Sequence, residues 1–232
     1  AFTFGYPAGW DMAGEDEANR EKAVEHLKRI IESMGVLGAT GIGGIVYSNW
    51  PADYSLQVIE PDDKKRRKDN CIAGLRKVMK TAEDNNVTVN LEIVNRFEHY
   101  LMNTAAEGIE VCKAVGSPNC KLLLDCFHMN IEEDSLPEAI RSARGYLGHF
   151  HVSEPNRKVP YHTDRIPWNE VGRALRDIGY DKAVIVESFY KFGGVQGHNM
   201  RMWRDLDPDL SLESRLKLAR QGIEYIRGQF GG

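Results

Sequence analysis

The segments VTVNLEIV (residues 87–94), KLLLDCF (121–127) and LGHFHV (147–152) decide the fold. Each is short and largely apolar, as strands buried on both faces of a parallel sheet are. Three further runs of the same kind are Phe2–Gly5, Gly41–Tyr47 and Ala183–Phe189. The sequence therefore predicts six strands, written Phe2–Gly5, Gly41–Tyr47, Val87–Val94, Lys121–Phe127, Leu147–Val152 and Ala183–Phe189.

Amphipathic helices are expected between and after these strands. Their apolar positions recur at helical spacing in four sets: Val24, Leu27, Ile31 and Met34; Ile72, Leu75, Met79 and Ala82; Val171, Leu175 and Ile178; and Leu212, Leu216, Ala219, Ile223 and Ile226. Ser135 and Glu138 form a capping-box pattern that begins a further helix, and the charged run Asp62–Asp69 is interpreted as a solvated helix start. Strands that alternate with helices predict an α/β fold with a parallel sheet, open or closed. No linker divides the chain, so one domain is expected over 1–232.

The composition excludes several classes of protein. The chain has 232 residues, 42% of them hydrophobic and 28% charged, with a net charge of −4, and no basic face that would suit nucleic acid. No apolar stretch is long enough to span a membrane, and Ala1–Trp10 does not resemble a signal peptide. The four cysteines form no metal-binding spacing, so we expect reduced thiols in a cytoplasmic protein.

Side chains that can bind a metal ion lie at or near the ends of four consecutive predicted strands. They are Glu92, Asp125, His151 and Glu187, each about one strand–helix unit from the next. Because parallel strands bring their carboxyl ends to one rim, these four side chains are expected to converge there. Three carboxylates and one imidazole would repel one another without a cation, and this donor set favours Mn²⁺, Co²⁺ or Mg²⁺.

Further polar residues lie just beyond the strand ends. Glu98 follows Glu92 by six residues, His128 follows Asp125 by three, and Arg157 follows His151 by six. Loop positions of this kind supply substrate contacts. His149, one layer deeper than His151, is interpreted as a packed core histidine.

Five motifs together resemble the D-tagatose 3-epimerase and D-allulose (D-psicose) 3-epimerase family, within the xylose-isomerase-like TIM barrels. The motifs are LEIVNRFE (91–98), LDCFHMNIEED (124–134), GHFHVSEPNRKVP (148–160), RIPW (165–168) and VIVESF (184–189). The resemblance implies a closed (β/α) barrel. Since such barrels have eight units, the chain is expected to lack the first two and to be N-terminally short, with about six units present.

This resemblance implies a metal-dependent isomerase that inverts C3 of a free ketohexose, converting D-fructose to D-allulose or D-tagatose to D-sorbose. The family's four metal ligands match Glu92, Asp125, His151 and Glu187. The two matching glutamates exchange the C3 proton on opposite faces of the sugar, through a cis-enediolate. One divalent ion per chain is implied, with Mn²⁺ first and Co²⁺ or Mg²⁺ as alternatives.

The same resemblance assigns the binding of the sugar's O1–O3 end to Glu98, His128 and Arg157, and the apolar walls of the pocket to Trp50 and Phe189. Relatives form dimers or tetramers, so a homo-oligomer is expected.

Three other functions stay open at this point. One is an aldose–ketose isomerase of the same superfamily, acting between C1 and C2. Another is a metal-dependent phosphodiesterase of the DNA-repair type, against which the acidic charge argues. The third is a non-catalytic truncated relative that binds sugar or metal.

Overall fold

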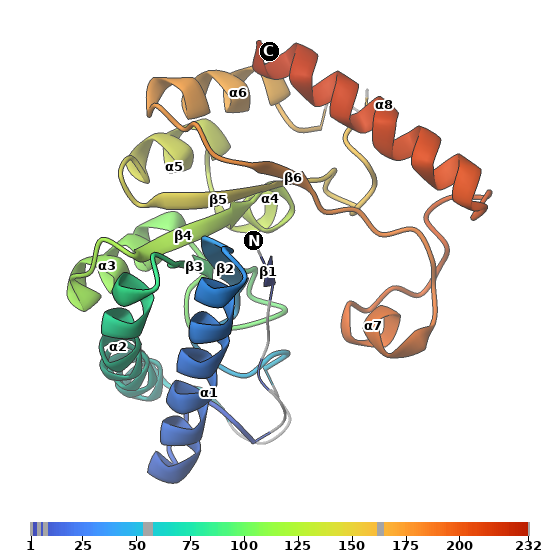
Figure 1. The fold of residues 1–232 in the computed structure, drawn as a ribbon. Coiled ribbons are helices and arrows are strands. Elements are labelled where there is room, and N and C mark those ends of the chain that lie inside the picture. The colour runs from blue at the N-terminus through green and yellow to red at the C-terminus, as the bar shows by residue number, and fades with distance from the viewer. Residues whose placement is uncertain (1, 4–5, 7–8, 53–57, 162–164, 232) are drawn as a thin grey trace.

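The computed structural model describes the chain except for residues 1, 4–5, 7–8, 53–57, 162–164 and 232 (Figure 1). Six strands form one parallel sheet in chain order: β1 (Phe2–Thr3), β2 (Gly41–Gly44), β3 (Thr88–Glu92), β4 (Cys120–Asp125), β5 (Leu147–Val152) and β6 (Val184–Val186). Among the described residues, β1 and β6 are the two edges of this sheet and do not pair with each other. The predicted parallel α/β fold is confirmed, as a curled, partial TIM-type barrel.

Each strand is followed by helical structure, which returns the chain to the start of the next strand after each of β1–β5. The helices are α1 (Glu17–Val36), α2 (Pro61–Asp84), α3 (Ala105–Val115), α4 (Cys126–Glu132), α5 (Leu136–Ser142), α6 (Trp168–Asp177), α7 (Gly194–Asn199) and α8 (Leu212–Phe230). In Figure 1 the sheet curls with α2, α3, α5 and α6 on its outer side, while α7 lies apart from this layer. No helix among the described residues combines the length and the apolar character that crossing a membrane requires.

The predicted strands are all present but mostly shorter than expected. β5 has the predicted bounds, whereas β4 ends at Asp125 because Asp125 caps α4 by accepting the Phe127 N–H at 2.8 Å. β6 covers only three residues, so Glu187 lies just after it. Part of the predicted first strand, residues 4–5, lies outside the described residues.

Helix starts follow their local chemistry. Ser135 accepts the Glu138 N–H at 3.4 Å and begins α5, as the capping pattern predicts. The charged run 62–69 lies in the first half of α2, where Pro61 occupies the first turn and a capping box joins Glu60 to Asp63. Three helices, α3, α4 and α7, were not predicted. The sequences of α4 and α7 show too few turns for a periodic pattern, and the buried face of α3 includes the small residues Ala105 and Gly108, which obscure its apolar spacing.

The core lies between the sheet and the outer helices. Leu122 and Leu124 on β4 and Phe150 on β5 are fully buried against helix side chains in one continuous apolar cluster. The opposite face lines the inside of the curl, where Asn90 donates to the Ile42 carbonyl at 3.0 Å. A side chain at Gly148 would collide with the Asn90 amide, so glycine is needed for the strands to come this close. The inner face of the curled sheet therefore carries polar as well as apolar side chains, so a polar site can lie on this face.

Candidate metal centre

The four predicted ligands meet at one rim of the sheet. Glu92 ends β3, Asp125 ends β4, His151 lies near the end of β5, and Glu187 follows β6. Asp125 and His151 are partners in the β4–β5 register, which places them side by side. One ligand atom from each of the four residues lies within 4.8 Å of the others. The convergence expected from strand phase is therefore present in the structure.

The donor set suits a divalent cation. Asp125 and His151 are buried, with 0% and 2% of their side chains exposed, whereas Glu92 and Glu187 reach the cavity with 13% and 28% exposed. His151 Nδ1 lies 3.1 Å from a Glu187 oxygen, and its Nε2 is buried without a hydrogen-bond partner in the described structure. Buried carboxylates need a counter-charge. Together these residues form a possible divalent metal site.

Arg157 supplies positive charge to the same cluster. Its Nη1 donates to Asp125 and, at 2.9 Å, to Glu187 Oε2. Its Nη2 lies 3.1 Å from His128 Nε2, and its guanidinium stacks over the Phe127 ring at 4.0 Å from the centroid. Burial disfavours the charged guanidinium, but Asp125 and Glu187 outweigh this effect and raise the pKa of Arg157. Arg157 therefore stays charged at every physiological pH.

The surroundings shift the pKa values of the Glu92 and Asp125 carboxyl groups in opposite directions. Burial, reinforced by the nearby Glu187, raises the pKa of Glu92 to about 8. Burial alone would also raise the pKa of Asp125, but the Arg157 charge lowers it overall. Burial would lower the pKa of His151, yet its hydrogen bond to Glu187 raises that pKa. A raised and a lowered carboxyl pKa in one cluster are typical of sites that handle protons.

A second group of side chains lies beside the ligands. His128 Nδ1 accepts the Asn95 backbone N–H at 3.1 Å, and the Asn95 side-chain nitrogen lies 2.8 Å away. Glu98 accepts the Trp50 indole N–H at 3.0 Å and lies 3.9 Å from His128. Burial, followed by the Arg157 charge, lowers the pKa of His128 to about 3, so this imidazole is neutral. Burial is also the largest cause of the raised pKa of Glu98.

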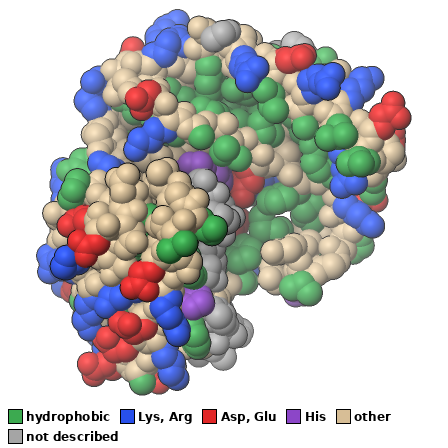
Figure 2. All heavy atoms as spheres, viewed as in Figure 1, with side chains coloured by type: hydrophobic (Ala, Val, Ile, Leu, Met, Phe, Trp, Pro, Cys, Tyr) green, Lys and Arg blue, Asp and Glu red, His purple; other side chains and the backbone are tan. Residues whose placement is uncertain are grey.

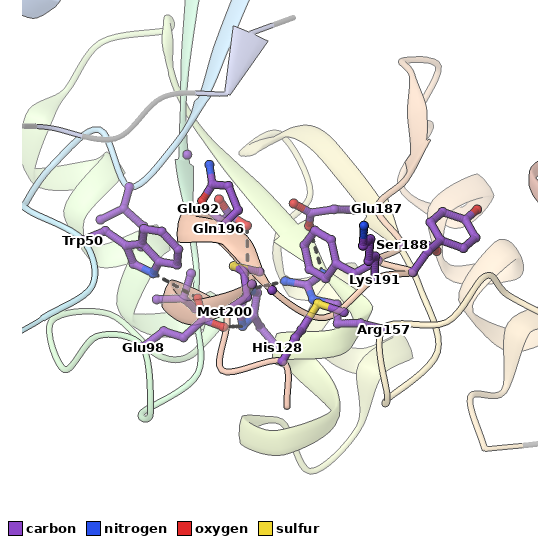
Figure 3. Close-up of a pocket in the computed structure, with 18 of the residues that line it drawn as sticks. Trp50, Glu92, Glu98, His128, Arg157, Glu187, Ser188, Lys191, Gln196 and Met200 are labelled. Atoms are coloured by element: carbon purple, nitrogen blue, oxygen red, sulfur yellow. Dashed lines mark hydrogen bonds and ion pairs between the residues drawn. The ribbon is translucent and has the colours of Figure 1, made fainter. Parts of the chain in front are cut away.

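These residues border a cavity of about 570 Å³ (Figure 3). Its lining includes seven of the predicted site residues: Trp50, Glu92, Glu98, His128, Arg157, Glu187 and Phe189. Asp125 and His151 do not line this cavity. They are buried beside Glu92 and Glu187, which do line it, and these two buried ligands are called the floor of the metal site. Figure 2 shows the hollow that opens between the main body and the segment carrying α7. The cavity is large enough for a monosaccharide.

Sequence reasoning missed several lining residues. Lys191, Gln196 and Met200 come from the segment around α7, and Arg215 comes from the start of α8. No strand end or periodic pattern marks these positions, so their placement depends on how the segment after β6 folds back over the cavity. Asn95, which does not line the cavity but donates to His128, lies inside the quoted motif LEIVNRFE and was within reach of a motif-based search. The core interpretation of His149 is confirmed by its burial.

Comparison with known proteins gives consistent matches. A family model described as "Xylose isomerase-like TIM barrel" matches residues 2–227. A D-psicose 3-epimerase of Agrobacterium fabrum is 41% identical over 222 residues, covering 96% of this chain and 75% of that protein. One from Ruminiclostridium cellulolyticum is 44% identical over 223 residues, covering 96% and 74%.

Solved structures agree with these relatives. A D-psicose 3-epimerase crystallised in the presence of D-fructose superposes with a TM-score of 0.94 at 40% identity, over 99% of this chain and 78% of that one. Another from Clostridium cellulolyticum H10, with D-tagatose, also gives 0.94 at 39% identity, over 98% and 77%. These names agree with the predicted carbohydrate isomerase class and confirm the resemblance seen in the motifs. The chain belongs to the xylose isomerase-like TIM barrel family.

Proposed function

We propose that this protein is a metal-dependent ketose 3-epimerase that interconverts free ketohexoses such as D-fructose and D-allulose, or D-tagatose and D-sorbose. The observation that carries the proposal is the placement of Glu92 and Glu187, which come from the non-neighbouring strands β3 and β6 yet offer oxygens within 4.8 Å of a shared ligand set. Figure 3 displays both residues at the same cavity. Inversion at a carbon needs two proton-transfer groups on opposite faces, and two carboxylates that approach one site from different strands support this pair for that role.

The two glutamates divide the proton work. An ionised carboxylate removes the proton from C3, and the other, in its acid form, returns a proton to the opposite face. The raised pKa of Glu92, about 8 from burial and the neighbouring Glu187, keeps it mostly protonated near neutral pH in the metal-free site. When the other epimer is bound, the two roles exchange.

Glu92, Asp125, His151 and Glu187 would hold the ion, for which we propose Mn²⁺, with Co²⁺ or Mg²⁺ as alternatives. A bound divalent cation would stabilise the negative charge that develops on the sugar oxygens when C3 loses its proton. Asp125 and His151, which lie on the buried floor, would anchor the ion. Glu92 and Glu187 can then reach both ion and sugar.

The neighbouring polar group would bind the O1–O3 end of the sugar. Arg157 and neutral His128 present hydrogen-bonding groups next to the ligands, and Glu98 is held towards the cavity by the Trp50 indole. Trp50 and Phe189 add apolar walls against which the carbon face of a sugar can pack.

We also propose that the protein acts as a homo-oligomer, a dimer or tetramer. Support comes from apolar side chains that are exposed on the β6–α8 side, among them Ile185, Leu212 and Leu216. Exposed apolar groups of this kind favour association. A cytoplasmic location stays a prediction from the cysteines.

A Mn²⁺-supplemented assay tests the proposed function. The protein is incubated with D-fructose, D-tagatose and a pentulose in ²H₂O, and the products are separated by chromatography. We expect allulose from fructose, with deuterium at C3, and a turnover that the matched variant Glu187→Gln loses. Formation of glucose or mannose would instead indicate aldose–ketose isomerisation. If none of the three ketoses gives an epimer or exchanges its C3 hydrogen for deuterium, the result would contradict the proposed epimerase function.

A further inference from the structure

The backbone at Arg157 has an unusual conformation. Its φ is +63°, in the left-handed region, where a non-glycine residue is strained and persists only when its surroundings hold it. The Arg157 N–H donates to the Glu154 carbonyl at 2.8 Å, and its own carbonyl accepts the Phe189 N–H at 3.0 Å. This conformation aims the guanidinium at Asp125 and Glu187. The turn before Arg157 therefore determines where its charge lies.

Glu154 closes that turn at several points. Its N–H donates to the Lys158 carbonyl at 2.9 Å, and its carbonyl accepts from Arg157. Its side-chain Oε1 accepts the Tyr161 backbone N–H at 3.1 Å and the Trp168 indole N–H at 3.3 Å. The Glu154 carboxylate thus links a position before Arg157 to two positions after it, Tyr161 and Trp168, the first residue of α6.

The Glu154 carboxylate is buried, which is costly unless its interactions compensate. Glu154 is 1% exposed and does not border the cavity, so it takes no direct part in the proposed chemistry. Burying a carboxylate is unfavourable unless its hydrogen bonds replace those lost to water. The hydrogen bonds it accepts from Tyr161 and Trp168 fix the far end of the same loop that carries Arg157.

We propose that Glu154 is a positioning residue: by clamping the 153–161 loop to Trp168, it holds the Arg157 guanidinium between Asp125 and Glu187. The role depends on an oxygen that accepts two N–H groups, rather than on negative charge. A glutamine oxygen can accept the same two donors, whereas a leucine of similar size accepts none. The kinetic part of this inference rests on the proposed epimerase function.

The test compares Glu154→Gln and Glu154→Leu in the full chain loaded with Mn²⁺. The matched control is Glu133→Leu, which removes a half-buried carboxylate that accepts the Ala105 N–H at 2.7 Å on a different loop. Two quantities are measured well below the melting temperature of each variant. One is kcat/KM for the preferred ketose. The other is the rate of tryptic cleavage after Arg157 and Lys158, which needs no turnover.

We expect Glu154→Leu to lower kcat/KM by up to about 10²-fold, the size of effect that a misplacement of about 1 Å produces, and to speed cleavage at this loop. Glu154→Gln should restore both quantities to near the wild-type values, and Glu133→Leu should change neither. A purely structural role would lower the melting temperature of Glu154→Leu but leave its kcat/KM unchanged.

Two results would overturn the inference. One is an unchanged kcat/KM and an unchanged cleavage rate in folded Glu154→Leu. The other is a glutamine variant as impaired as the leucine variant, which would assign the effect to charge. If the wild-type protein turns over no ketose, the proposed function fails instead, and the cleavage rates alone then decide whether Glu154 clamps the loop.

Discussion

The strands that carry Asp125 and His151 differ sharply from the strand that precedes Glu187. β4 and β5 lie in the middle of the sheet, and nearly all of their residues are buried. β6 is a three-residue edge strand whose central Ile185 is 42% exposed. Asp125 and His151 are thus fixed by packing, whereas Glu187 is fixed by hydrogen bonds from Arg157 and His151. The buried pair Asp125 and His151, the floor of the site, is therefore held more rigidly for metal binding. Glu187, called the wall, is held less rigidly and has more freedom for proton transfer.

The largest effects on Mn²⁺ affinity and on turnover should come from substituting Asp125, which is buried, and Glu187, which borders the cavity. Asp125→Asn keeps the cap on α4 but replaces a buried ligand, so Mn²⁺ affinity should fall by more than the roughly 10–100-fold typical of changes to residues around a ligand shell. Glu187→Gln should lower turnover by about 10²–10⁴-fold, as loss of a proton-transfer group does, with a smaller loss of Mn²⁺ affinity.

Calorimetric Mn²⁺ titration and the fructose assay measure these two effects separately. Tight Mn²⁺ binding by Asp125→Asn would remove Asp125 from the ligand set. Equal losses of affinity in the two variants would abolish the distinction between floor and wall.

The same contrast predicts unequal stability losses. Leu122→Ala in β4 removes a fully buried side chain and should lower the free energy of unfolding by about 2–5 kcal/mol. Ile185→Ala in β6 removes an exposed one and should change it by no more than about 0.5 kcal/mol. Urea unfolding followed by circular dichroism compares them. A comparable loss at Ile185 would show that the β6 edge is covered in solution, as in the proposed oligomer.

A further predicted effect concerns acid. Burial, with help from the Arg67 and Lys64 charges, lowers the pKa of His99 to about 3 from an ordinary 6.5. The unfolded chain therefore binds this proton first, so His99 lowers stability as pH falls from about 6.5 towards 3, by about 1.4 kcal/mol per pH unit. His99→Gln should flatten this part of the stability profile relative to the wild type. Identical slopes in the two proteins would place the acid sensitivity elsewhere.

The four metal-type residues could be predicted from the positions of the strand ends in the sequence. Glu92, Asp125 and His151 were predicted together because buried strands have a distinctive composition and their carboxyl ends share one rim. Glu187 was found by the same rule although its strand is shorter than predicted. The short helices α4 and α7 escaped because a helix of two turns leaves no periodic signature. Lys191 and Gln196 escaped because their place at the cavity depends on that irregular segment.

The sequence by itself determined the parallel α/β order and the rim at which four metal-type side chains gather, because both follow from local composition repeated once per strand–helix unit. Only the tertiary structure decided that Arg157 lies among those ligands, that Asn95 orients His128, and that Glu154 holds the loop between them. These relations depend on a left-handed backbone turn and on hydrogen bonds between distant segments, neither of which has a local pattern in the chain.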